Sequence, residues 1–249
     1  MPVFYEQELI HIHNPRCGGT FINRALAKCL NIPAQTFSVK NLSYHYLFGN
    51  HDVGRDKYEL DHLTLSLIRD AVPSWIFDSF TSFVVVRHPW DRFTSEYTRK
   101  VSTGCRRFIN HKNLSFEEYC LKFLNICRRR FDADVGFREM SHFQSCHFLP
   151  QYFYTGREDR NASCRKPEII RLGKINSKLP QLLTPECSNR FVDLLDQQAK
   201  NSHRDIVSSE IKKSVEKISS EVMGKVERFY RDDYRILNFK PYSKADLRD

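Results

Sequence analysis

Short apolar runs alternate along the chain with stretches whose apolar residues have helical spacing. The runs at 8–13, 82–87 and 168–172 have the length and composition of buried strands. Helical spacing predicts helices over 20–30, 64–72, 90–101, 115–127, 185–199 and 207–231. Because strands alternate with helices, the pattern predicts a three-layer α/β fold, with a mostly parallel sheet flanked by helices.

The helix expected from residue 115 carries its own start signal. Ser115 and Glu118 have the spacing of a capping box, in which each side chain bonds to the backbone N–H of the other residue. The run Arg128–Arg130 is expected at the end of this helix, because cations are favoured at the negative end of the helix dipole.

The first predicted strand leads into the first predicted helix through a turn that contains two glycines, Gly18 and Gly19. Such a turn directs several backbone N–H groups, and the positive end of the helix dipole, toward one point. That arrangement favours an anion such as phosphate, and the Thr20 hydroxyl adds a donor. The alternative is an ordinary corner between a strand and a helix.

The second predicted strand ends at Arg87, and open α/β sheets place ligands at this carboxyl end of their strands. Pro89 suits the first turn of the helix that follows, and Ser95 lies about two turns into that helix. An arginine and a hydroxyl offered together form a plausible clamp for phosphate. An arginine–aspartate pair that caps the helix is the simpler alternative.

Together the two segments resemble the sulfotransferases that use 3′-phosphoadenosine 5′-phosphosulfate (PAPS), in their carbohydrate and heparan-type branch. Residues 15–20 are similar to the family's loop for the 5′-phosphosulfate, and residues 86–97 to its segment for the 3′-phosphate. The resemblance implies the following donor-binding residues: Arg16, Cys17, Gly18, Gly19, Thr20, Arg87 and Ser95. Shorter similarities lie at 61–69, 168–176 and 229–234.

The resemblance implies a P-loop NTPase-like sulfotransferase fold, with residues 1–249 as a single domain. It also assigns a catalytic part to Arg16, which stands where the family usually has lysine. Because arginine does not give up its proton at ordinary pH, Arg16 would stabilise the sulfonate electrostatically. Cys17 replaces a frequent threonine and is expected only to fit the loop.

Transfer to an alcohol requires a group that accepts the proton of the acceptor. His62 occupies the position of a histidine in the family's segment before a helix, so the resemblance makes it the expected base. His45 and His51 are the alternative candidates for the base and are expected near the acceptor. Gln151 resembles a glutamine near the family's acceptor cleft.

The formal net charge of +9 suits an anionic donor but would equally suit nucleic acid. The resemblance favours the donor, and it implies no metal and no nucleic-acid partner. No segment has the apolar length of a membrane span, and Glu6 and Glu8 interrupt any signal-peptide pattern, so we expect a cytoplasmic enzyme. A Golgi-lumen catalytic domain without its anchor is the alternative, and Cys146 and Cys164 would then be able to form a disulfide.

The expected reaction is transfer of a sulfuryl group from PAPS to a hydroxyl group, with a carbohydrate as the expected acceptor. A P-loop kinase would use the same strand, loop and helix, but the chain lacks the Gly-Lys-[Ser/Thr] ending of that motif. A non-catalytic module that binds nucleotides or polyanions is the third alternative, because basic residues cluster at 106–107 and 128–130.

Overall fold

The computed structural model describes residues 3–31, 62–104, 109–110, 114–131, 146–156, 166–201 and 209–242. Contacts divide the chain into two compact units. The sheet unit comprises residues 1–87 and 151–202, and the helical unit comprises residues 88–150 and 203–249. The single domain expected from the sequence stays a prediction.

The sheet unit contains a four-stranded sheet in the order β1-β2-β3-β4. Its strands are β1 (Val3–Phe4), β2 (Leu9–Ile12), β3 (Thr81–Val86) and β4 (Glu168–Arg171). The pairs β2–β3 and β3–β4 are parallel, whereas β1 pairs antiparallel with β2. The predicted α/β class and mostly parallel sheet are therefore confirmed, and the three predicted strands agree within one residue at each end. The two-residue strand β1 gave no pattern of its own.

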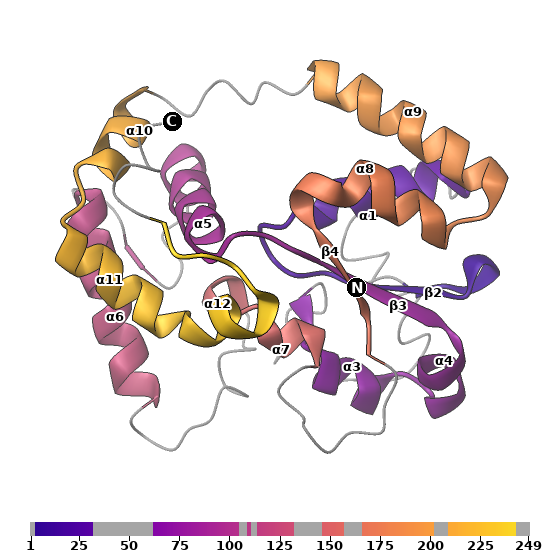
Figure 1. The fold of residues 1–249 in the computed structure, drawn as a ribbon, viewed down its shortest axis with the longest axis horizontal. Helices are drawn as coiled ribbons and strands as arrows, with labels where there is room; N and C mark the ends of the chain where they lie inside the picture. Colours follow the sequence, from indigo (N-terminus) through magenta and orange to yellow (C-terminus); the bar gives the residue numbers. More distant parts are fainter. Residues whose placement is uncertain are drawn as a thin grey trace. The chain divides into compact units, whose positions relative to one another are not determined.

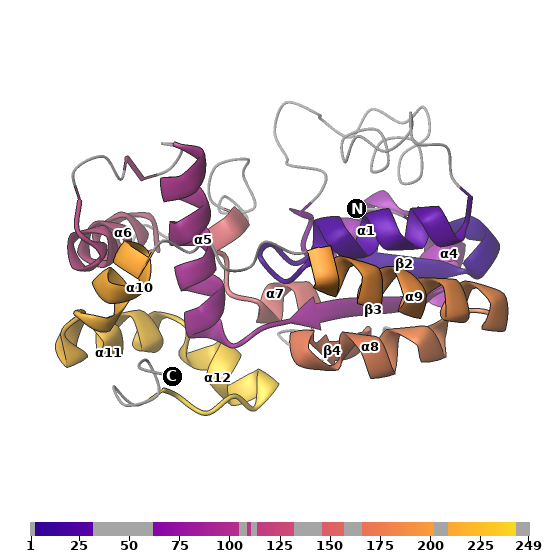
Figure 2. The same ribbon diagram turned by 90° about the horizontal axis from the view of Figure 1, so that it is seen from above.

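Helices lie on both faces of this sheet (Figure 1), with α1, α8 and α9 on one face and α3, α4 and α7 on the other. The α-helices of the unit are α1 (Gly19–Cys29), α3 (Leu65–Ala71), α4 (Ser74–Ser79), α7 (Tyr152–Thr155), α8 (Ile175–Lys178) and α9 (Pro185–Asn201). Short 3-10 helices occur at Tyr5–Gln7, Leu172–Lys174 and Leu179–Leu182. Figure 2 shows α1 and α9 side by side.

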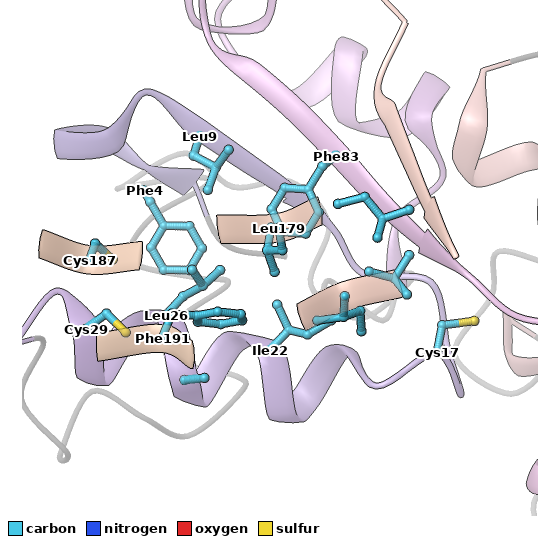
Figure 3. Packing of buried hydrophobic residues seen from close by; sticks show 14 residues of the cluster. Phe4, Leu9, Cys17, Ile22, Leu26, Cys29, Phe83, Leu179, Cys187 and Phe191 are labelled. Atoms are coloured by element: carbon cyan, nitrogen blue, oxygen red, sulfur yellow. The ribbon is translucent and has the colours of Figure 1, made fainter. Parts of the chain in front are cut away.

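The face under α1, α8 and α9 carries the core of the sheet unit (Figure 3). Phe83 and Val85 alternate along β3 and point into this core, as the two-residue period of a strand requires. Ile22 and Leu26, one turn apart on α1, pack against them, and Phe191 of α9 closes the cluster. Burial of each of these side chains stabilises the unit by about 1.5–3 kcal/mol, so α1 is held firmly against the sheet.

The helical unit packs around aromatic side chains. Its α-helices are α5 (Pro89–Thr103), α6 (Phe116–Phe131), α10 (Ser209–Glu216), α11 (Ser220–Phe229) and α12 (Arg231–Leu237), with a 3-10 helix at Cys146–Phe148. Phe93 of α5 lies at the centre, with ring centroids 4.9 Å from Phe123 and 6.3 Å from Tyr230. Among the described residues, none of the helices is long and apolar enough to cross a membrane.

At two helix boundaries the structure can be compared with the prediction from the local sequence pattern. The capping box is confirmed, because the Glu118 N–H donates to Ser115 Oγ at 3.2 Å and the Ser115 N–H donates to Glu118 Oε2 at 2.7 Å. The single helix predicted over 207–231 is wrong. It is interrupted between α10 and α11, where the Ser219 hydroxyl accepts from the Val222 N–H at 3.3 Å and starts a new helix.

Candidate active site

The turn between β2 and α1 is shaped by two residues with left-handed backbone. Arg16 has φ +64° and Gly18, the residue before the helix, has φ +81°. Glycine adopts this conformation without strain, whereas an L-residue such as Arg16 pays about 1–2 kcal/mol for it. A costly conformation that the surrounding structure maintains is typical of functional loops.

Gly19 is required for a different reason, because the ring of His13 lies against it. A Cβ atom at Gly19 would be 1.9 Å from Cδ2 of His13, well inside any tolerable contact. Because Gly19 has no side chain, the His13 ring can pack directly against the first residue of α1. His13 is buried at this position.

The first turn of α1 presents donors without carbonyl partners in the helix. The Ile22 N–H already bonds to the Gly18 carbonyl, which leaves the N–H groups of Gly19, Thr20 and Phe21 at the helix start. The positive end of the helix dipole lies at the same place. Thr20 is exposed and Arg16 is half-buried, so both side chains can reach a ligand. This arrangement suits an anionic group.

Arg87 follows β3 directly and belongs to the same unit as the loop. Because β2 and β3 are parallel and Ile12 pairs with Val84, both strands end at the same edge of the sheet. The Asn14 side chain joins the two strand ends by donating from Nδ2 to the Val85 carbonyl at 3.0 Å. The structure therefore brings the predicted loop and the predicted arginine to one edge. Arg87 itself is half-buried.

Gln151 is fully buried, and its amide is hydrogen-bonded within the protein. Nε2 donates to the Arg87 carbonyl at 2.7 Å, and Oε1 accepts from the Arg87 N–H at 2.9 Å. Oε1 also accepts from Asn14 Nδ2 at 3.1 Å and from the Cys17 thiol at 3.4 Å. These bonds argue against the acceptor contact predicted from the sequence, because the amide is already used inside the protein.

His62 lies just before α3, and its side chain is only 7% exposed. Its Nδ1 lies 3.2 Å from the carbonyl oxygen of His13, and the two rings meet edge to face with centroids 4.5 Å apart. Since a carbonyl oxygen only accepts, Nδ1 carries the proton in this contact. In the neutral ring Nε2 is then the basic nitrogen, which is the state that a general base requires.

His11 stacks on His13, the residue that His62 contacts, and its ring is held neutral. Burial lowers the pKa of its ring to about 4, although the hydrogen bond to Asn23 acts in the opposite direction. The His11 ring stacks on Phe83, with centroids 4.7 Å apart, and its Nδ1 contacts the Asn23 side chain on α1. We therefore assign His11 to the attachment of α1 to the sheet.

The remaining predicted site residues lie in the helical unit or outside the described residues. Ser95 lies on α5 of the helical unit, half-buried, and its role in binding the 3′-phosphate stays a prediction. His45 and His51 lie outside the described residues, as does Cys164 of the possible disulfide. Cys146 is buried. Among the described residues, no group of three or more histidine, cysteine or acidic side chains is arranged to hold a metal ion.

Sequence reasoning missed one cluster of charged groups, on α5. Glu96 is 1% exposed and pairs with Arg99 at 2.6 Å and with His147 Nδ1 at 3.0 Å. Burial by itself would raise the pKa of Glu96, but the hydrogen bonds from Arg99 and His147 lower it well below 4.5. The His147 contact spans 51 positions, so no local spacing indicated it.

Comparison with known proteins gave one family. The model of the Sulfotransferase family matches residues 3–240, which cover nearly the whole chain and include residues of both units. No curated protein and no solved structure matched the chain.

Proposed function

The chain belongs to the sulfotransferase family, and we propose that it transfers a sulfuryl group from PAPS to a hydroxyl group of a carbohydrate. The observation that carries the proposal is the common sheet edge at which the loop of residues 13–18 and Arg87 both lie. One group of N–H donors lies at the start of α1, and a permanent cation, Arg87, follows the neighbouring strand. Two separated anionic groups on one small molecule would match these two features.

The residues at this edge fit the donor in their chemistry. The start of α1 supplies N–H donors, and Arg16 and Arg87 supply guanidinium groups, which favour phosphate and sulfonate oxygens. PAPS carries an activated sulfonate on its 5′-phosphate, and a second phosphate on the 3′ position of the same ribose. We assign the first to the loop with Arg16 and the second to Arg87.

Two side chains have proposed roles in the reaction itself. The guanidinium of Arg16 remains protonated and would stabilise negative charge that develops on the leaving phosphate oxygen. His62 would take the proton of the acceptor hydroxyl at Nε2, because Nδ1 is directed at the His13 carbonyl. The imidazolium formed in this way would keep its Nδ1 hydrogen bond, so the ring need not turn during proton transfer.

Donor binding is tested with adenosine 3′,5′-bisphosphate, the product that PAPS leaves, by isothermal calorimetry. Loss of the charged contacts in Arg87→Ala should weaken binding by about 10- to 100-fold. Arg190→Ala is the matched control. Arg190 donates to Lys28 O and Asn31 Oδ1 on the outside of the same unit, so this variant loses the same charge elsewhere. Equal affinities of the wild type, Arg87→Ala and Arg190→Ala would contradict the assignment.

The reaction is tested by incubating the protein with sulfur-labelled PAPS and a panel of glycans, phenols and small alcohols. Label on a glycan supports the proposal, whereas label on a phenol or a small alcohol would keep the transfer and change the acceptor. Turnover of ATP that depends on Mg²⁺, without binding of the bisphosphate, would favour a kinase. Steeply salt-dependent binding to heparin without transfer would favour a polyanion-binding module.

A further inference from the structure

Gln151 lies between the two anion-binding features of the proposed site without being part of either. It precedes α7, and its side chain is fully buried. It is separated from Arg87 by 64 positions and from Asn14 by 137 positions, so the fold alone brings these residues together.

Toward Arg87 the Gln151 amide acts like the backbone of a neighbouring strand. It donates to the Arg87 carbonyl at 2.7 Å and accepts from the Arg87 N–H at 2.9 Å. β3 ends at Val86, so Arg87 has left the sheet where these two bonds are made. A two-point contact to one residue restricts its backbone dihedrals and thereby the direction in which its side chain leaves the chain.

Toward the loop the same Oε1 atom accepts two further bonds, from Asn14 and from Cys17. Asn14 uses its other amide hydrogen on the Val85 carbonyl of β3. Cys17 is 1% exposed and lies one residue before Gly18, the N-cap residue of α1. One oxygen atom thus links the loop to the backbone of Arg87.

We propose that Gln151 is a positioning residue that holds Arg87 and the loop at a fixed separation, so that the two anionic ends of one donor are bound at the same time. This inference rests on the proposed function. A rigid separation raises the affinity for a ligand that carries both anionic groups, because the second contact forms without further ordering of the protein. It adds much less for a ligand with only one of them.

The test compares two nucleotides by calorimetry, adenosine 3′,5′-bisphosphate and adenosine 5′-monophosphate. The dissociation constant of the monophosphate divided by that of the bisphosphate gives a ratio that measures the gain in affinity from the 3′-phosphate. In Gln151→Met, which has a similar size but no amide, the ratio should fall by about tenfold. Affinity for the monophosphate should change much less. A residue that only stabilises the fold would leave this ratio unaltered.

Thr155→Val is the matched control, because it also removes a buried polar group from the same segment. Thr155 is fully buried, and its hydroxyl donates to the Tyr152 carbonyl of the same helix, α7, at 2.8 Å. This variant should unfold at a lower temperature but keep the wild-type ratio. Circular dichroism and thermal melting establish that each variant is folded.

Gln151→Glu is the second variant if Gln151→Met does not fold. It keeps the size and the acceptor toward the Arg87 N–H but has no N–H for the Arg87 carbonyl, so the ratio should fall here too. An unchanged ratio in either folded variant overturns the inference while leaving the proposed function intact. Failure of both variants to fold would also count against it, since it would indicate a role in stability alone. A wild type that binds neither nucleotide overturns the proposed function and the inference together.

Discussion

Nδ1 of His62 lies 3.2 Å from the carbonyl oxygen of His13, and this contact ties the proposed base to the loop that would hold the donor. His13 in turn packs against Gly19, the first residue of α1. A chain of direct contacts thus runs from the base through the His13 residue to the helix start. The position of His62 depends on the same backbone that forms the turn proposed to bind the donor.

Replacement of His62 by alanine should lower kcat by about 10²–10⁴-fold, which is the usual contribution of a general base. Affinity for adenosine 3′,5′-bisphosphate should stay close to that of the wild type, because His62, whose Nδ1 contacts the His13 carbonyl, is not among the residues proposed to bind the donor. Single-turnover kinetics with labelled PAPS separates the two effects. Unchanged turnover in this variant would mean that another group accepts the proton.

Replacement of Gly19 by alanine should disrupt the turn. The new Cβ would lie 1.9 Å from the His13 ring, so either the ring or the helix start must move, and nucleotide affinity should fall together with thermal stability. Gly173→Ala is the control, because a Cβ there meets nothing within 4 Å. Calorimetry and melting curves of the two variants give the comparison. Similar behaviour of both variants would show that the close approach of His13 is unimportant.

Glu96→Gln should change the dependence of stability on acid. The pKa of Glu96 is lowered in the folded protein, so its contribution is complete above the ordinary value of 4.5 and is lost as the pH falls below it. At neutral pH the variant should be less stable by about 3–5 kcal/mol, because Arg99 and His147 lose a buried partner. In acid the difference should shrink. Urea denaturation measured at several pH values provides the test.

Glu221→Gln is the control for this experiment. Glu221 also pairs with a cation, Lys225 at 2.6 Å, but its side chain is 75% exposed. Solvent screens such a pair, so the variant should unfold almost as the wild type does at every pH. An equal loss in both variants would contradict the special role of the buried pair.

Ser115→Ala should destabilise the protein by about 1 kcal/mol, the usual cost of losing an N-cap. The Ser115 hydroxyl accepts from the Glu118 N–H at 3.2 Å, and alanine leaves that donor to solvent. Ser115→Asn retains an acceptor at the same place and should restore most of the stability. Chemical denaturation of the three proteins gives the free energies of unfolding, and equal values for all of them would contradict the contribution of the cap.

Local features were predictable because their signals lie within a few residues. The strand before the loop follows from a short apolar run. The helix after it and the capping box of Ser115 and Glu118 follow from spacings of three to four positions. Local reasoning failed at Ser219, where the apolar pattern continues through a helix end and the serine that starts α11 gave only a weak signal.

The sequence by itself determined the two segments rich in donors and cations, since hydrophobic periods and turn residues act locally. For the same reason it located β2, β3 and β4 and the helices α1, α3, α5, α6 and α9. Only the tertiary structure decided that Gln151 would bond to Arg87, Asn14 and Cys17, and that Glu96 would pair with His147. Hydrogen bonds between such distant residues depend on how parallel strands bring their ends to one edge and on how helices pack. A spacing along the chain does not contain that information.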